Sequence, residues 1–202
     1  AQFNYLDPES SSSSDQVIDK FRRVFVRTTK SELGLAPPHR LLRWVPMSPA
    51  QQRLYSALAT DAGRHLQGLS VSDRLRFRRF ARCVQYMIQA ASNPSLLVSS
   101  SLAGHELLTE VIAEGLSAKL QCASSLARSW VMEGHKVLIW STFVSTVEHL
   151  AGLLTDVGAE FIHGGVATSE DPDAYDTREA KIRDFNDESS SCRVLVANPA
   201  AC

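Results

Sequence analysis

The sequence has no long apolar run and no leader of basic and apolar residues at its N-terminus. A membrane-spanning helix needs about 20 consecutive apolar residues, and no stretch of the 202 residues approaches that length. A secretory signal begins with basic residues followed by an apolar segment, whereas this chain begins Ala1-Gln2-Phe3-Asn4. We therefore expect no membrane partner and an intracellular, cytoplasmic location, associated with the nucleoid if the organism is prokaryotic.

Cysteine is scarce, with four residues at positions 83, 122, 192 and 202. None of them forms a Cys-x-x-Cys pair, the spacing typical of zinc sites and of redox motifs. Small disulfide-stabilised domains also carry a much denser set of cysteines. The spacing therefore predicts no metal site and no disulfide framework, and buried free thiols are the expectation.

The motifs that hold a nucleotide are missing as well. A phosphate-binding loop of the form Gly-x-x-x-x-Gly-Lys-Ser/Thr needs a Gly-Lys pair, and none of the five lysines follows a glycine. The sequence also has no Asp-Glu-x-His stretch that could hold magnesium and orient water. We expect no catalytic residue in this chain and no ATP hydrolysis by the chain alone, whatever enzyme it is part of.

The positive charge that is present is concentrated in one region. The formal net charge is −1, yet residues 20–82 carry fourteen Lys or Arg against three acidic residues, a net +11. Arg74, Arg76 and Arg78 alternate there with apolar residues, so a helix could pack on one side and carry cations on the other. A nucleic-acid backbone is one partner for such a face. A solvated helix, or pairing with acidic residues of another domain, explains the pattern equally well.

The first half of the sequence is typical of helices. Residues 1–15 include a serine run and are expected to be a flexible segment. Ser48 followed by Pro49 and Gln51 predicts a helix start with a capping box, and apolar residues at helical spacing follow. A second helix is expected from Asp73 to Ala91 because Asn93-Pro94 would stop it. The inner face expected for the first helix is Leu54, Leu58, Ala62 and Leu66.

The second half predicts an α/β sheet around the stretch Lys136–Phe143. The four apolar residues Val137–Trp140 suit a strand buried on both faces, with Trp140 in the core. Ser145 and Glu148 have the spacing of a capping box at the start of the next helix. Gly158 is expected to end that helix.

Two further strands and two more helices complete the pattern. Strands are expected at Ala159–Ile162 and Arg193–Ala197, with helices at Ser117–Met132 and Thr177–Phe185. The inner face expected for the last helix is Ala180, Ile182 and Phe185. Alternating strands and helices favour right-handed crossovers and a parallel sheet. A domain boundary is placed near residue 100.

These residues, in this order, resemble the second motor lobe of superfamily-two helicases, with the Swi/Snf-type branch most similar. The N-terminal half resembles the segment that joins the two lobes in that family. The resemblance covers about Phe21 to Cys202 and depends on order and spacing. The segments that carry it are Arg27–Glu32, Met47–Pro49, Asn93–Leu97, Lys136–Ser141, His163–Gly165, Arg178, Ile182–Asn186 and Val194–Ala197.

The resemblance implies a helical inter-lobe region over residues 16–100 and an incomplete RecA-like parallel sheet with flanking helices over residues 101–202. It implies part of an ATP-dependent double-stranded-DNA translocase that uses ATP and magnesium, forms one wall of the ATP cleft, and works with a first RecA-like lobe. It also implies phosphate contacts at the carboxyl ends of the strands, although Ser141 and Thr142 could instead only cap the next helix. The expected nucleic-acid-binding residues are Ser141, Thr142, His163, Gly164, Gly165 and Asn198, with Arg74, Arg76 and Arg78 added from the charge pattern.

Two other interpretations remain open from the sequence. One is a binding or scaffold module without motor ancestry, built from helices and a small Rossmann-like domain. The other is a relative of the α/β-hydrolases, since His163-Gly164-Gly165 is similar to their oxyanion-hole turn. The hydrolase interpretation lacks a nucleophile elbow, because the nearest candidate, Gly115 to Lys119 with Ser117 at its centre, has no second glycine.

Overall fold

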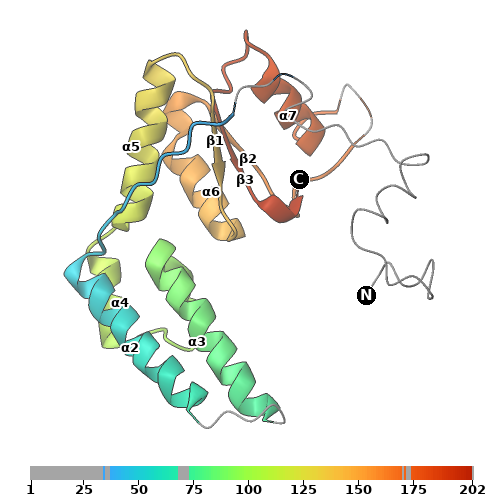
Figure 1. The fold of residues 1–202 in the computed structure, drawn as a ribbon. Helices are drawn as coiled ribbons and strands as arrows, with labels where there is room; N and C mark the ends of the chain where they lie inside the picture. Colours follow the sequence, from blue (N-terminus) through green and yellow to red (C-terminus); the bar gives the residue numbers. More distant parts are fainter. Residues whose placement is uncertain (1–33, 35–36, 68–72, 170, 172–173, 202) are drawn as a thin grey trace. The chain divides into compact units, whose positions relative to one another are not determined.

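The computed structural model describes residues 34, 37–67, 73–169, 171 and 174–201. The expected flexible segment 1–15 and the resemblance over Arg27–Glu32 lie outside the described residues. The chain divides into two units, residues 1–43 and 44–202. Every helix and strand described below belongs to the second unit (Figure 1).

The first helix, α2 (Pro49–Leu66), begins where the sequence predicts. The Ser48 hydroxyl accepts a hydrogen bond from the backbone N–H of Gln51 at 3.1 Å. The side chain of Gln51 does not return to the cap as a capping box requires. It donates instead to the carbonyl of Ala90 on the next helix at 2.6 Å. One half of the predicted box is therefore confirmed, and the other half is replaced by a bond between helices.

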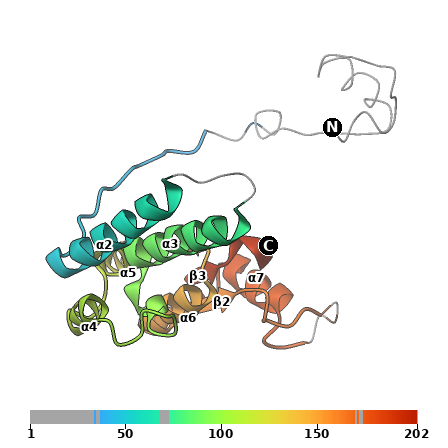
Figure 2. The same cartoon turned by 90° about the horizontal axis from the view of Figure 1, so that it is seen from below.

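The next helix, α3 (Arg74–Ser92), also has the predicted limits, with Asp73 at its N-terminus and Asn93 at its C-terminus. The helices α2 and α3 lie side by side (Figure 2). A short 3-10 turn, η2 (Pro94–Leu97), leads on to α4 (Glu106–Ala113), which packs against α2. Leu66, expected on the inner face of α2, is half exposed. The buried core of these helices is Ala50, Leu54, Leu58, Ala90, Leu97, Leu108 and Val111.

Among the described residues, the sheet has three short parallel strands. They are β1 (Val137–Trp140), β2 (Ala159–Ile162) and β3 (Val194–Ala197), in the spatial order β1-β3-β2. The last strand in the sequence is therefore the central one. Both the parallel arrangement and the positions of the strands confirm the predicted α/β class.

Helices cover both faces of this sheet (Figure 1). On one face, α5 (Ala118–Met132) and α6 (Val144–Leu153) pack against the sheet. On the other face, α7 (Arg178–Asn186) lies over β2, with Phe185 against the buried residues of β2 and β3. The core of the first face is Leu120, Ala127, Val137, Val147, Leu150, Ala151, Leu154, Val194 and Val196.

The expectation that β1 is buried on both faces is wrong. Leu138 is 44% exposed and Trp140 is 50% exposed, so Trp140 is not a core residue. Both side chains point to the same face, because alternate residues of a strand share a face. The strand β1 lies at the edge of the described sheet, and α7 packs over β2 on that face. Only the central strand, β3, is buried at all four positions.

The predicted capping box of Ser145 and Glu148 is wrong too. The helix α6 starts after Phe143, and no side chain hydrogen-bonds to its first turn. Gly158 does not end α6 directly, because a 3-10 turn, η3 (Thr155–Val157), intervenes. Gly158 then has φ +67°, and a Cβ atom there would lie 2.0 Å from the carbonyl oxygen of Ser191. Only glycine fits this position, for its backbone angle and for the space.

The inner face of α7 differs from the prediction at one residue. Ile182 is 40% exposed, whereas the neighbouring Lys181 is only 8% exposed. A buried lysine needs acidic partners, and Lys181 has two. Among the described residues, no helix combines the length and the apolar composition needed to cross a membrane.

Candidate nucleic-acid interface

The carboxyl ends of the three strands meet at one edge of the sheet. The register pairs Trp140 of β1 and Ile162 of β2 with Ala197 of the central strand. Two hydrogen bonds continue the pairing by one residue. The N–H of Ser141 donates to Ala197 O, and the N–H of Asn198 donates to Ile162 O, both at 3.0 Å. The structure therefore brings together the three predicted positions that follow the strands, since His163 comes directly after Ile162.

Asn198 is the buried member of this edge, with 6% exposure. Its side-chain amide donates to the carbonyl oxygens of Ser141 at 3.2 Å and Thr142 at 3.0 Å. Its side-chain oxygen accepts a hydrogen bond from the N–H of Ala200 at 2.9 Å. The residue after β3 thus holds the loop after β1 in place.

Ser141 and Thr142 form that loop. The Ser141 hydroxyl accepts a hydrogen bond from the N–H of Phe143 at 3.4 Å, and Thr142 is exposed. The N-cap residue of α6, Phe143, provides no side-chain cap, and the Ser141 hydroxyl bonds the N–H of that residue. Among the described residues, the Thr142 hydroxyl makes no hydrogen bond to α6, so the capping alternative is wrong for Thr142 and stays open for Ser141.

The turn His163-Gly164-Gly165 is held through its histidine. His163 Nδ1 accepts a hydrogen bond from the N–H of Gly165 at 3.0 Å, and Nε2 lies 3.1 Å from a carboxylate oxygen of Glu148. Since Nδ1 is an acceptor, Nε2 carries a hydrogen and donates it to Glu148. The ring also stacks on Phe161, with centroids 5.4 Å apart. Both glycines remain exposed.

Arg178 shapes the same turn, although it was not among the predicted binding residues. Its guanidinium donates to the carbonyl oxygens of Gly164 and Val166, both at 3.0 Å, and of Ala201 at 3.4 Å. One side chain therefore joins the loop after β2 to the segment after β3. The sequence had singled out Arg178 only as one of the residues that carry the resemblance, near the start of the predicted helix Thr177–Phe185.

The three predicted arginines of α3 form a separate surface. Arg74, Arg76 and Arg78 are all exposed, and Arg76 Nε lies 3.4 Å from Asp73. The apolar side expected beneath them is not buried, because Leu75 is 60% exposed and Phe77 is 58% exposed. The charge pattern correctly predicted an exposed cationic surface on α3, but it did not predict that Leu75 and Phe77 are exposed as well.

The cavity near the sheet edge does not include those arginines. It has a volume of about 530 Å³ and is lined by the C-terminal half of α3, by α5 and by the loop after β1. Its α3 residues are Val84, Met87, Ile88, Ala91 and Ser92, whereas none of the three arginines lines it. The structure therefore does not join the arginine surface to the sheet edge.

Comparisons with known proteins show which folds this chain is similar to, but they assign it to no family. The sequence matches no known protein family and no curated protein. Among solved structures, 24 chains are similar. The C-terminal part of the Fun30 ATPase domain matches 80% of this chain and 69% of its own length, with 12% identity and a TM-score of 0.50. The Hef helicase domain of Pyrococcus furiosus matches 93% of this chain, with 12% identity and a TM-score of 0.53.

The chain has a partial RecA-like α/β fold, similar to parts of these two domains. The chain spans about half of the Hef helicase domain, 53% of its length. The hydrolase alternative has no support in this fold, because Ser117 is the N-cap of α5. Its hydroxyl donates to the carbonyl oxygen of Ser92 at 2.7 Å.

A cluster of charged side chains joins α7 to β2. Lys181 Nζ lies 2.7 Å from carboxylate oxygens of both Glu160 and Asp176, and 4.9 Å from the ring centre of Phe161. Burial by itself lowers the pKa of Lys181, but hydrogen bonds to Asp176 and Glu160 outweigh it, so the pKa is raised. The hydrogen bond to Lys181 lowers the pKa of Asp176.

Proposed function

We propose that this chain is part of an ATP-dependent double-stranded-DNA translocase of the Swi/Snf type. In this proposal, the edge of the sheet where the carboxyl ends of β1, β2 and β3 meet, here called the strand-end edge, contacts phosphates of one DNA strand. The observation that carries the proposal is the register at that edge. It aligns Ser141, His163 and Asn198, the residues after three neighbouring parallel strands. Open α/β sheets bind ligands at the carboxyl ends of their strands.

The chemistry of the edge suits phosphate rather than bases. Thr142 offers an exposed hydroxyl, and the exposed Gly164 offers a backbone N–H that a phosphate can approach without a side chain in between. The N–H of Gly165 is already bonded to His163 and shapes the turn. Hydroxyl and backbone N–H groups commonly contact DNA phosphates, and such contacts carry no sequence information. The proposal therefore predicts binding that tolerates any DNA sequence.

Asn198 and Arg178 have a different role in this proposal. Their polar groups already hold carbonyl oxygens of the two loops that flank the edge. They position the loops, while Thr142 and the glycine turn contact the DNA. Glu148 acts in the same way on His163, whose ring fixes the turn through Gly165.

Arg74, Arg76 and Arg78 supply a second, electrostatic contact. They are exposed on one half of α3, and their charge attracts the DNA backbone through counterion release. The apolar residues between them are exposed as well. This surface favours duplex DNA in general over any particular sequence.

ATP and magnesium belong to the complete protein in this proposal. The chain lacks the Gly-Lys pair of a phosphate-binding loop and an Asp-Glu-x-His stretch. A first RecA-like lobe would supply both, and this chain would form one wall of the cleft. The similarity to an ATPase domain and a helicase domain supports this division of roles at the level of the fold.

The experiment is duplex-DNA binding by this chain, measured by fluorescence anisotropy for the wild type and for Thr142→Ala. Loss of one phosphate hydrogen bond should weaken binding about 2- to 10-fold, since such a bond contributes about 0.5–1.5 kcal/mol. The melting temperature should stay at the wild-type value, because Thr142 is exposed and caps no helix.

The matched control is Thr109→Ala, which removes a hydroxyl from the exposed surface of α4. It should leave DNA affinity unchanged. If Thr142→Ala binds DNA as the wild type does, the strand-end edge is not a phosphate site. If the variant melts early and keeps full affinity, Thr142 contributes to stability instead.

A further inference from the structure

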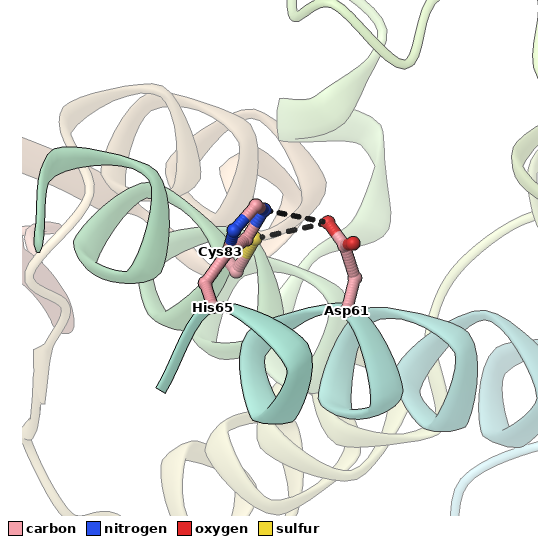
Figure 3. Close-up of side chains that lie close together, drawn as sticks. All are labelled: Asp61, His65 and Cys83. Atoms are coloured by element: carbon pink, nitrogen blue, oxygen red, sulfur yellow. Dashed lines mark hydrogen bonds and ion pairs between the residues drawn. The ribbon is translucent and has the colours of Figure 1, made fainter. Parts of the chain in front are cut away.

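Three different metal-ligating side chains meet between α2 and α3, away from the strand-end edge. Asp61 and His65 lie one helical turn apart on α2, and Cys83 reaches them from α3 (Figure 3). Cys83 Sγ lies 3.3 Å from Asp61 Oδ2, and His65 Nε2 lies 3.7 Å from the same oxygen. One ligand atom from each residue lies within 4.8 Å of the other two.

These separations match a tetrahedral metal site. With zinc–sulfur bonds of about 2.3 Å and zinc–nitrogen or zinc–oxygen bonds of about 2.0–2.1 Å, ligand atoms in a tetrahedron lie about 3.3–3.6 Å apart. The observed distances of 3.3 and 3.7 Å are already close to that range.

The ligand types select a class of metal. A thiolate and an imidazole favour zinc, whereas calcium and magnesium take oxygen ligands almost entirely. Zinc with one thiolate, one carboxylate and one neutral imidazole is also electrically neutral. That balance suits a site whose cysteine is 7% exposed, because a buried net charge is costly.

The hydrogen bond inside the cluster describes its metal-free form. The Cys83 thiol donates its hydrogen to Asp61 Oδ2 at 3.3 Å. On metal binding this proton leaves to solvent, and the sulfur and the carboxylate oxygen both turn to the metal.

We propose that Asp61, His65 and Cys83 bind one zinc ion, with water as the fourth ligand. The ion would join the C-terminal end of α2 to the half of α3 that carries the exposed arginines. Closing a loop in this way stabilises a fold by restricting its unfolded state. The site would therefore hold the arginine surface in a defined position relative to α2.

Cobalt(II) is the probe, because cobalt bound to a thiolate absorbs light through a charge-transfer band that oxygen and nitrogen ligands do not produce. The wild-type chain should bind one Co²⁺ with this band, and zinc should displace it. Cys83→Ser should lose the band. Cys122→Ser, which removes a cysteine elsewhere on α5, should keep it.

His65→Gln provides a test that does not alter the buried thiol. It should weaken zinc binding at least tenfold and remove the rise in melting temperature that zinc gives the wild type. His135→Gln, at an exposed histidine, should change neither. Absence of the band in the wild type, or its persistence in Cys83→Ser, would overturn the proposal. If Cys83→Ser does not fold, unchanged zinc affinity in His65→Gln would overturn it equally.

Discussion

The side-chain amide of Asn198 donates a hydrogen bond to the carbonyl oxygen of Thr142 at 3.0 Å. This bond links the residue after β3 to the loop after β1, which lies 56 residues earlier in the chain. The position of the exposed Thr142 hydroxyl therefore depends on a buried residue of another strand. A change at Asn198 should therefore affect the stability of the strand-end edge, whereas a change at Thr142 should affect DNA binding.

Asn198→Ala should destabilise the chain. The variant removes the side-chain donor of two partly buried loop carbonyl oxygens, and each lost hydrogen bond costs about 0.5–1.5 kcal/mol of the free energy of unfolding. Urea denaturation measures this loss. The control Asn186→Ala, at an exposed residue that ends α7, should cost much less. Equal stability of the two variants would show that the Asn198 hydrogen bonds do not hold the loop.

Replacing Arg74, Arg76 and Arg78 together by glutamine should flatten the salt dependence of DNA binding. Each phosphate contact contributes about 0.9 to the slope of log affinity against log salt. Three lost contacts should therefore reduce the slope by about 3. The measurement is a set of anisotropy titrations at several salt concentrations.

The control for that triple variant removes the same charge elsewhere. Arg53, Arg64 and Arg183 are exposed and lie on α2 and α7. Their joint replacement by glutamine should change the slope less than the α3 triple variant does. Slopes that fall equally would mean that net charge, and not the α3 surface, governs binding.

Lys181→Met should lower stability by about 1–2 kcal/mol at neutral pH. The variant removes the cation that Glu160 and Asp176 share, and the solvent exposure of both carboxylates limits the loss. Urea denaturation at pH 7 measures it against Lys119→Met, at an exposed lysine. The Lys119 variant should match the wild type.

The stabilising effect of Lys181 should also depend on pH. The lowered pKa of Asp176 adds stability above the ordinary aspartate pKa of about 3.9, and this is lost as the pH falls through the lowered value. The raised pKa of Lys181 adds stability below about 10.4, which is lost as the pH rises through the raised value. The gap between wild type and Lys181→Met should therefore narrow at both extremes. A gap of constant size from pH 3 to pH 7 would contradict the ion-pair account of Asp176.

The chain should hydrolyse no ATP above background, with or without duplex DNA. It contains no Gly-Lys pair and no Asp-Glu-x-His stretch, so it cannot cradle the phosphates or orient water in the known way. A phosphate-release assay measures this. Turnover stimulated by DNA in a preparation free of other ATPases would refute the assignment of the catalytic residues to another lobe.

The local elements could be predicted from the sequence because their signals are local. Ser48 and Asp73 cap their helices with their own side chains, and the limits of β2 follow from four residues between Gly158 and His163. The carboxyl-edge residues were also predictable, because parallel strands end at a common edge. The juxtaposition of Asp61, His65 and Cys83 was not predicted, because cysteine spacing was the only signal considered, although Asp61 and His65 already stood at helical spacing.

The sequence by itself determined where most helices and strands form, since caps, breakers and apolar periodicity act over a few residues, although the helix α4 (Glu106–Ala113) was not predicted. It also determined the concentration of arginines on one helix. Only the tertiary structure decided which strand is central, and hence that β3 is buried while Trp140 at the edge strand is half exposed. Burial and hydrogen-bond partners depend on segments distant in sequence, which is why Lys181, Asn198 and Cys83 acquired their contacts only when the chain folded.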